Sequence, residues 1–253
     1  MRTADWNESI SVLDRVTAVF DSFGDHDEGL GVSELARRAN LPKSTVSRIA
    51  ADLVAQRFLD REGDKLFLGV RLFELGQTVE RPRRLRQVAL PVMTDLRNQT
   101  GHTVILAVLE GADIVIVATV RGEAAPTPLA RVGGRLPAHA TALGKALLAF
   151  SPDGRDPRST HHALSRCTAH TIRQPSEFLR ELAGVRRNGV AVEREECAVG
   201  RGGVASPVLD YCSAAIAAIG VTGSVDELDP DRVTAAVRAS AITLSHRSLT
   251  GRR

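Results

Sequence analysis

Short hydroxyl side chains and cations gather at the start of one expected helix, in the stretch LPKSTVSRI. The apolar residues of this helix follow the i, i+3, i+4, i+7 spacing of a single buried stripe: Val46, Ile49, Ala50 and Leu53. The polar face opposite carries Lys43, Ser44, Thr45, Ser47 and Arg48. Such hydroxyls can reach phosphate oxygens or base edges in a major groove, and arginine can bind guanine through two hydrogen bonds. The pattern predicts a DNA recognition helix; the alternative is the solvated face of an ordinary helical hairpin.

The elements before this helix support the first interpretation. Ser33 is the expected N-cap of a preceding short helix whose apolar side is Leu35, Ala36 and Ala39. Asn40-Leu41 should end that helix, and Pro42 suits the first turn of the next because an N–H has no partner there. Two helices joined by so tight a turn predict a helix-turn-helix.

A two-stranded hairpin should follow immediately. Residues 58–62 and 65–68 flank a Gly63-Asp64 turn, which predicts the wing of a winged helix-turn-helix. Arg61 and Lys65 of this hairpin should meet the phosphate backbone. The complete set of expected DNA contacts is Ser33, Lys43, Ser44, Thr45, Ser47, Arg48, Arg61 and Lys65.

The charge distribution agrees with this placement. The chain of 253 residues has a net charge of +3. Residues 1–32 hold two bases and seven acids, net −5, whereas residues 33–71 hold eight bases and five acids, net +3. Positive charge is therefore concentrated in the segment expected to face DNA.

Enzymatic, metal and redox functions find little support. Cys167, Cys197 and Cys212 have no metal-ligand spacing, and an odd number does not make a disulfide framework. The acids at 195 and 196 should raise the pKa of Cys197, which argues against a reactive thiolate. The sequence contains neither a nucleophile elbow nor a pair of histidines at metal-ligand spacing. The candidate residues for a hydrolytic site are His139, His161, His162, His170, Ser206 and Asp210. We expect no enzyme and no cofactor, with a hydrolase or a redox sensor carrying a helix-turn-helix as the alternative.

No apolar run reaches the length of a membrane span, and the N-terminus lacks the apolar core of a signal peptide. We therefore expect a cytoplasmic protein without a membrane partner.

The rest of the chain predicts a second, different domain. An N-terminal helix is expected at 9–23, capped by Ser9, and after the wing a helix at 70–76 and a basic linker at 80–86, either solvated or in contact with phosphates. Strands are expected at 103–109, 114–120, 189–195, 204–210 and 214–222, with helices at 87–99, 141–150, 175–187 and 229–249. The near-continuous apolar character of the first two strands implies burial on both faces. Helices that bracket antiparallel strands predict an α+β fold.

The helix expected at 141–150 could bind an anion. The backbone N–H groups of Ala142, Leu143 and Gly144 lie at its start, where the helix dipole favours negative charge. A plain buried helix start is an equal alternative. Lys145 follows a glycine, but no GxxxxGK[ST] motif precedes it, so nucleotide binding is not predicted.

Four stretches in order resemble the IclR family of bacterial transcriptional regulators: LPKSTVSRI, RLFELG, GGRLPAHATALGKALLA, and NGVAVEREECAVGRGGVASPV followed by AAIAAIGVTG. The resemblance implies a winged helix-turn-helix domain at 1–76, a linker helix at 77–89, and a GAF-like effector-binding and oligomerisation domain at 90–253. It also implies a repressor or activator that binds double-stranded promoter DNA as a homodimer or homotetramer. Leu72, Phe73 and Leu75 are the expected dimer seam.

The same resemblance implies a pocket for a small organic effector, lined by Pro128, Leu136, Ala142, Leu143, Glu193, Gly203, Gly220 and Thr222. Relatives that bind small oxo-acids tend to carry Cys and Ser where this chain has Gly203 and Gly220, which suggests a larger cavity here. We expect an aromatic or medium aliphatic acid. Its anionic end would face the helix start, and Glu193 would accept a hydrogen bond from a hydroxyl or amine.

Overall fold

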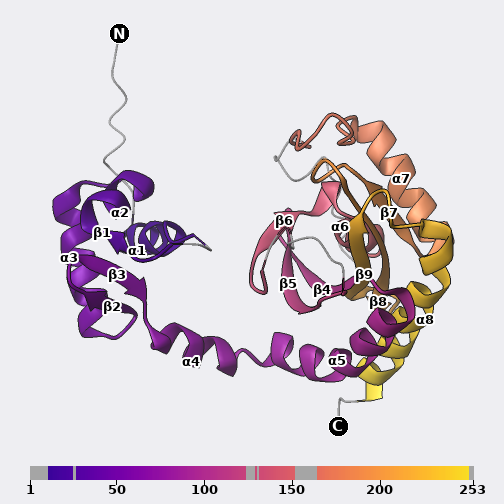
Figure 1. Ribbon diagram of the computed structural model, residues 1–253, viewed down its shortest axis with the longest axis horizontal. Coiled ribbons are helices and arrows are strands. Elements are labelled where there is room, and N and C mark those ends of the chain that lie inside the picture. Colours follow the sequence, from indigo (N-terminus) through magenta and orange to yellow (C-terminus); the bar gives the residue numbers. More distant parts are fainter. Residues whose placement is uncertain (1–10, 25–26, 124–128, 130, 152–163, 251–253) are drawn as a thin grey trace. The chain divides into compact units, whose positions relative to one another are not determined.

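The computed structural model describes residues 11–24, 27–123, 129, 131–151 and 164–250. The chain divides into two compact units, Met1–Glu80 and Arg81–Arg253 (Figure 1). The sequence-based boundaries at 76 and 90 remain predictions. No helix within the described ranges is long and apolar enough to cross a membrane.

The first unit packs helices on a small antiparallel sheet. Its helices are α1 (Val12–Asp21), α2 (Val32–Ala39) and α3 (Lys43–Ala55). The sheet has the order β1 (Leu30–Gly31), β3 (Lys65–Leu68), β2 (Leu59–Glu62). The predicted stripe of α3 is buried, and it shares a core with Val19, Leu35, Leu59 and Leu66. This arrangement confirms the winged helix-turn-helix.

Two predicted helix caps are wrong. The N-cap of α1 is Ser11, whose hydroxyl accepts the N–H of Asp14 at 3.0 Å in a capping box, while Ser9 lies outside the described residues. The N-cap of α2 is Gly31, and Ser33 lies inside the helix. The helix starts earlier than expected because β1 pairs with β3 up to Gly31 and the chain turns directly from strand to helix. Asn40 does end α2, in the left-handed conformation with φ 52°.

Two helices follow the wing, α4 (Val70–Thr78) and α5 (Glu80–Thr100). The expected linker at 80–86 is therefore helical, and α5 is continuous through the segment where a new helix was expected at 87. Pro82 is compatible with this because it lies in the first turn, where no intrahelical N–H bond is lost. None of the residues of α4 is buried.

The second unit is built on a six-stranded antiparallel sheet with the order β6-β5-β4-β9-β8-β7. Its strands are β4 (Thr103–Glu110), β5 (Asp113–Val120), β6 (Arg135–Pro137), β7 (Ala191–Arg194), β8 (Arg201–Leu209) and β9 (Ala215–Ser224). All pairings are antiparallel, which confirms the α+β class.

Helices cover both faces of this sheet (Figure 1). One face packs on α5 and α8 (Pro230–Thr250), and the other packs on α6 (Ala142–Ala149) and α7 (Pro175–Asn188). In β4, Val104 and Leu106 face the first layer while Ile105 and Ala107 face the second. This alternation explains the near-continuous apolar strands of the sequence, since side chains on both faces of these strands are buried.

Candidate functional site

The polar face of α3 is solvent-exposed. Lys43, Ser44, Ser47 and Arg48 are exposed, and Thr45 is half-buried. These side chains project from the first two turns, because the buried stripe fixes the opposite face of the helix in the core. A helix held in this way presents its N-terminal turns as one rigid surface.

The wing and α2 supply the remaining predicted contacts. Arg61 and Lys65 are exposed on paired strands of the wing, and Ser33 is exposed on α2. The Lys65 Nζ donates to the carbonyl oxygen of Glu28 at 3.0 Å, which ties the wing to the segment before β1. Whether these residues touch DNA stays a prediction.

Two arginines of α2 are engaged within the protein. Glu34 accepts from Arg37 at 2.6 Å and from Arg38 at 2.8 Å, and Arg38 also donates to Asp27 at 2.7 Å. The hydrogen bonds from Arg37 and Arg38 lower the pKa of Glu34 to about 2. The positive charge of α2 is thus largely balanced locally, whereas α3 has no acid in its first turn.

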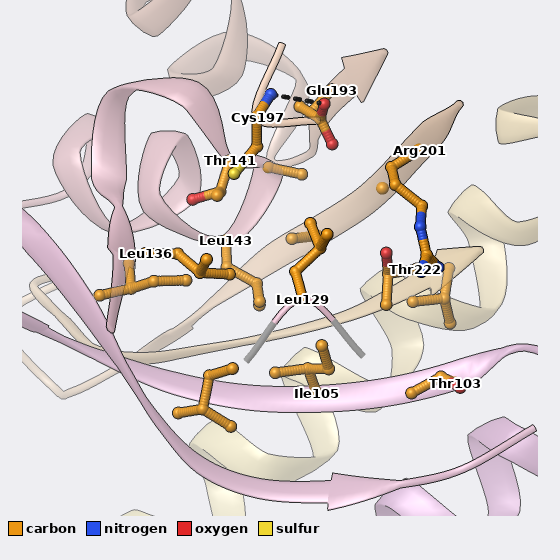
Figure 2. Close-up of a pocket in the computed structure, with 16 residues that line it drawn as sticks. Thr103, Ile105, Leu129, Leu136, Thr141, Leu143, Glu193, Cys197, Arg201 and Thr222 are labelled. Carbon is orange, nitrogen blue, oxygen red and sulfur yellow. Dashed lines mark hydrogen bonds between the residues drawn. The ribbon is translucent and has the colours of Figure 1, made fainter. Parts of the chain in front are cut away.

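A partly enclosed pocket lies in the second unit between the sheet, the start of α6 and the turn after β7 (Figure 2). Its volume is about 50 Å³. Six of the eight predicted effector residues line it: Leu136, Ala142, Leu143, Glu193, Gly203 and Thr222. The sequence did not single out the other lining residues, which are Thr103, Ile105, Ile114, Ile116, Leu129, Thr141, Cys197, Arg201, Ala205 and Val221. Alternation along each strand could have indicated that Thr103 and Ile105 share one face of β4 and that Ile114 and Ile116 share one face of β5, but Arg201 has no comparable signal.

Of the other two predicted residues, only Gly220 can be compared with the pocket lining. Pro128 lies outside the described residues. Gly220 does not line the cavity, because the space that a Cβ would take is already filled: the Val204 carbonyl oxygen would lie 2.5 Å away and the Ala205 Cβ 2.7 Å away. Gly220 therefore allows close packing of β8 and β9 and does not enlarge the pocket. The Ala-rich segment at 214–218 does not contribute to the described lining.

Gly203 is different. A Cβ there would meet the Ala142 Cβ at 3.5 Å and the Glu193 Oε2 at 3.6 Å, which are ordinary contact distances. The missing side chain at 203 thus leaves space beside Glu193 and the start of α6.

Glu193 is a buried acid on the pocket wall. It is 7% exposed, and its Oε1 accepts the backbone N–H groups of Glu196 at 2.7 Å and Cys197 at 3.3 Å. The second of these bonds is drawn in Figure 2. Burial raises the pKa of Glu193 to about 7, against the lowering effect of the two N–H bonds. One carboxylate oxygen is thus held by the backbone, and the other lies close to Gly203.

The remaining polar groups of the pocket have partly fixed roles. Thr222 Oγ1 donates to the Gly202 carbonyl at 3.0 Å, so its lone pairs are what it can offer a ligand. Thr141 caps α6 by accepting the N–H of Gly144 at 3.1 Å, and Ala142 and Leu143, the first residues of the helix, line the pocket. Figure 2 shows Arg201 and Thr222 at one side and Leu129 in the middle.

The thiol of Cys197 is not activated. Burial, followed by the charge of Glu193, raises its pKa to about 12. The expectation that nearby acids raise this pKa is correct in direction, but burial is the larger cause.

Three of the hydrolytic candidates, Ser206, Asp210 and His139, are engaged with the backbone, while the Nε2 of His170 lies 3.8 Å from the Glu195 Oε2. Ser206 Oγ donates to the Gly189 carbonyl at 2.6 Å, and Asp210 Oδ1 accepts the N–H groups of Cys212 and Ala214. Both residues line a second cleft of about 370 Å³. The Nε2 of His139 lies 2.9 Å from the Ser165 carbonyl oxygen, and His161 and His162 fall outside the described residues. Within the part of the chain that the structure describes, no cluster of three His, Cys, Asp or Glu side chains could hold a metal ion.

A winged helix-turn-helix joined to a sheet domain with a small apolar pocket defines a ligand-responsive DNA-binding regulator. Comparison with known proteins agrees with this class. The IclR helix-turn-helix domain matches residues 12–63, and the C-terminal domain of bacterial transcriptional regulator IclR matches residues 77–246. The chain belongs to the IclR family of bacterial transcriptional regulators.

Individual relatives span nearly the whole chain. The chain is 31% identical to the glycerol operon regulatory protein of Streptomyces griseus over 236 residues, 92% of each protein. It is 28% identical to the transcriptional repressor IclR of Escherichia coli K12 over 237 residues, 92% of this chain and 86% of the relative. Among solved structures, an IclR homologue from Microbacterium hydrocarbonoxydans complexed with 4-hydroxybenzoate matches with a TM-score of 0.82 and 31% identity, over 93% of this chain and 98% of the other. The protein is a transcriptional regulator, and the relatives are regulators and not hydrolases.

Proposed function

We propose that the protein reads its operator with the exposed face of α3 and grips the adjacent phosphates with the wing. The observation that carries this is the separation of the α3 faces: one buried in the core, the other made of exposed hydroxyls and cations. Arg48 is the residue for base recognition, because a guanidinium can bind guanine bidentately. Lys65 is a phosphate contact, because an ammonium acts as a point charge.

Two substitutions test this assignment. Arg48→Ala should weaken specific binding by about 1–3 kcal/mol and relax the preference at one operator position. Lys65→Ala should weaken binding to all sequences alike and reduce the salt slope by about one unit. Fluorescence anisotropy with an operator selected from random DNA, repeated at several salt concentrations, measures both. Full operator affinity in an Arg48→Ala, Ser47→Ala double variant would refute the assignment.

We also infer that the protein works as a dimer or a tetramer in the cytoplasm, where its DNA lies. Phe73 on α4 is 65% exposed and Leu75 is 48% exposed, and no residue of α4 is buried in the single chain. A second copy covering these side chains would bury them, and two recognition helices would match two half-sites of DNA.

The pocket of the second unit is the proposed effector site. Its walls are mainly aliphatic, and its polar side chains are Thr103, Thr141, Glu193, Cys197, Arg201 and Thr222. Among the polar groups, Glu193, Thr222, Arg201 and the start of α6 are the proposed ligand contacts. An acid with an apolar body fits this chemistry. Its carboxylate would meet the Arg201 guanidinium or the first N–H groups of α6, and a hydroxyl at its other end would donate to Glu193. The hydroxybenzoate bound by the Microbacterium relative has this composition.

The size of the effector is set by Leu129 as well as by Gly203. A cavity of about 50 Å³ is smaller than the roughly 150 Å³ that accommodates benzene in an apolar protein interior. The Leu129 side chain lines the pocket and is drawn across the centre of the view in Figure 2, and we infer that it must move aside for an aromatic ring to enter. An effector that moves Leu129 can favour one arrangement of the DNA-binding units, and only such a difference in affinity between states changes operator binding.

Leu143→Trp tests the site, because the added ring fills the pocket. The variant should keep its affinity for the operator and lose its response to 4-hydroxybenzoate, measured as release or gain of labelled operator. The matched control is Ile242→Trp, which adds the same ring to an exposed position at the second cleft and should respond as the parent does. Loss of the response in the control, with retention in Leu143→Trp, would move the effector site to the second cleft.

We infer that the protein acts by binding alone and not by catalysis. The engagement of Ser206 and Asp210 with backbone groups supports this, since neither is arranged to activate a nucleophile. Recovery of unaltered 4-hydroxybenzoate after long incubation with the protein is the expected result; a chemically modified product would contradict it.

A further inference from the structure

Lys145 is completely buried, and four segments of the second unit meet at its ammonium group. Its Nζ donates to the Glu196 Oε1 at 2.5 Å, to the Glu181 Oε1 at 3.2 Å and to the Val192 carbonyl at 3.3 Å. Lys145 belongs to α6, Glu181 to α7, Val192 to β7, and Glu196 to the turn that follows β7. A single side chain thus connects the start of the pocket helix to the turn that carries part of the pocket wall.

The Lys145–Glu196 pair is a costly way to stabilise a fold. Glu196 is 7% exposed, and its Oε2 is buried without a hydrogen-bond partner among the described residues. Removing two charges from water commonly costs as much as their attraction returns, and apolar replacements of similar volume are often as stable. A buried pair of this kind is better explained by the geometry that it enforces.

That geometry concerns the turn at 195–200, which we call the pocket turn. Its first N–H groups, from Glu196 and Cys197, are bound by the pocket acid Glu193. Its carbonyl side is held by Thr168 and Thr171, whose hydroxyls donate to the carbonyl of Glu196 at 3.3 Å and 2.8 Å. The ends of the turn are joined by the Glu195 N–H, which donates to the Arg201 carbonyl at 2.7 Å, and by the Gly200 N–H, which donates to the Glu195 Oε1 at 2.7 Å. The Glu196 side chain is a further anchor, and it is the one that Lys145 holds.

We propose that Lys145 is a positioning residue of the effector pocket. By anchoring Glu196 it fixes the pocket turn, and the N–H groups of that turn then fix the Glu193 carboxylate against the pocket. Lys145 does not touch the cavity. It acts through the turn, whose N–H groups hold one oxygen of Glu193 so that the other is left for the effector. The consequence for effector binding rests on the proposed function, but the positioning itself does not.

Hydrogen exchange of the full-length protein without effector tests the proposal. A single substitution at either position leaves a buried charge unpaired. The decisive variant is therefore the double substitution Lys145→Met, Glu196→Gln, which removes both charges and should have a thermal unfolding midpoint near that of the parent. In this variant the amides of the pocket turn should exchange about tenfold faster, the change expected when local opening becomes easier by about 1.4 kcal/mol. Core amides of β8 and β9 should stay within about twofold of the parent.

Glu181→Gln is the matched control, because it removes the charge of a half-exposed partner of Lys145 and leaves the Glu196 contact in place. It should not change exchange in the pocket turn. Unchanged exchange at 196 and 197 in the double variant, or an equal acceleration throughout the unit, would overturn the proposal. If the turn loosens as expected but Leu143→Trp retains its effector response, the effector assignment fails and the positioning role of Lys145 stands.

Discussion

Glu193 should make the stability of the second unit depend on pH. Its pKa rises from an ordinary 4.5 to about 7 because the carboxyl group is buried. Below pH 4.5 the group is protonated in both the folded and the unfolded chain. Between pH 4.5 and 7 the folded chain keeps a proton that the unfolded chain loses, so stability falls as pH rises, and above pH 7 the full cost is present.

The size of this effect follows from the shift. At 1.36 kcal/mol per pKa unit, a shift from 4.5 to about 7 corresponds to about 3 kcal/mol, of which about 2.5 kcal/mol should develop between pH 5 and pH 8. Other charged groups also act on this carboxyl: the Glu196 carboxylate raises its pKa and the Lys145 ammonium lowers it, while Cys197 and Arg201 share the pocket wall.

Glu193→Gln isolates this contribution. The amide oxygen can still accept the N–H groups of Glu196 and Cys197, and the charge is gone. Urea unfolding of the parent and the variant at pH 5, 6, 7 and 8 measures the stability difference at each pH. The free energy of unfolding of the variant, relative to that of the parent, should rise by about 2.5 kcal/mol from pH 5 to pH 8, and this rise should be complete near pH 8. A stability difference that is the same at pH 5 and pH 8 would show that Glu193 is ionised throughout this range and would refute the reasoning.

Three further outcomes are expected. Gly220→Ala should destabilise the second unit by about 1–3 kcal/mol in urea unfolding because its methyl group would meet the Val204 carbonyl, whereas Gly203→Ala should cost little and narrow the pocket; equal costs would contradict the packing argument. Phe73→Asp should shift the protein toward monomer in sedimentation velocity, because a charge would enter the proposed seam, and an unchanged oligomer would place the interface elsewhere. Ser11→Ala should lower the stability of the first unit by about 1 kcal/mol through loss of the capping box, and thermal unfolding with no change would contradict this.

The sequence by itself determined the local architecture of the DNA-binding unit. The spacing of Val46, Ile49 and Leu53 defines the buried stripe of α3 and thereby the face left for DNA. Asn40 and the Gly63-Asp64 turn end their elements by local backbone preferences, which depend on neighbouring residues alone. The apolar strands of the second unit were recognisable for the same reason, because burial on both faces leaves a continuous apolar run.

Only the tertiary structure decided the composition of the pocket. Gly203 and Gly220 look alike in the sequence, but one lies beside Glu193 and the other is closed off by the packing of β8 against β9. Arg201 and Thr103 enter the lining from strands about a hundred residues apart in the chain. The burial that raises the pKa of Glu193 likewise comes from segments distant in sequence. Such properties depend on which side chains the sheet order brings together, and no local pattern of residues contains that information.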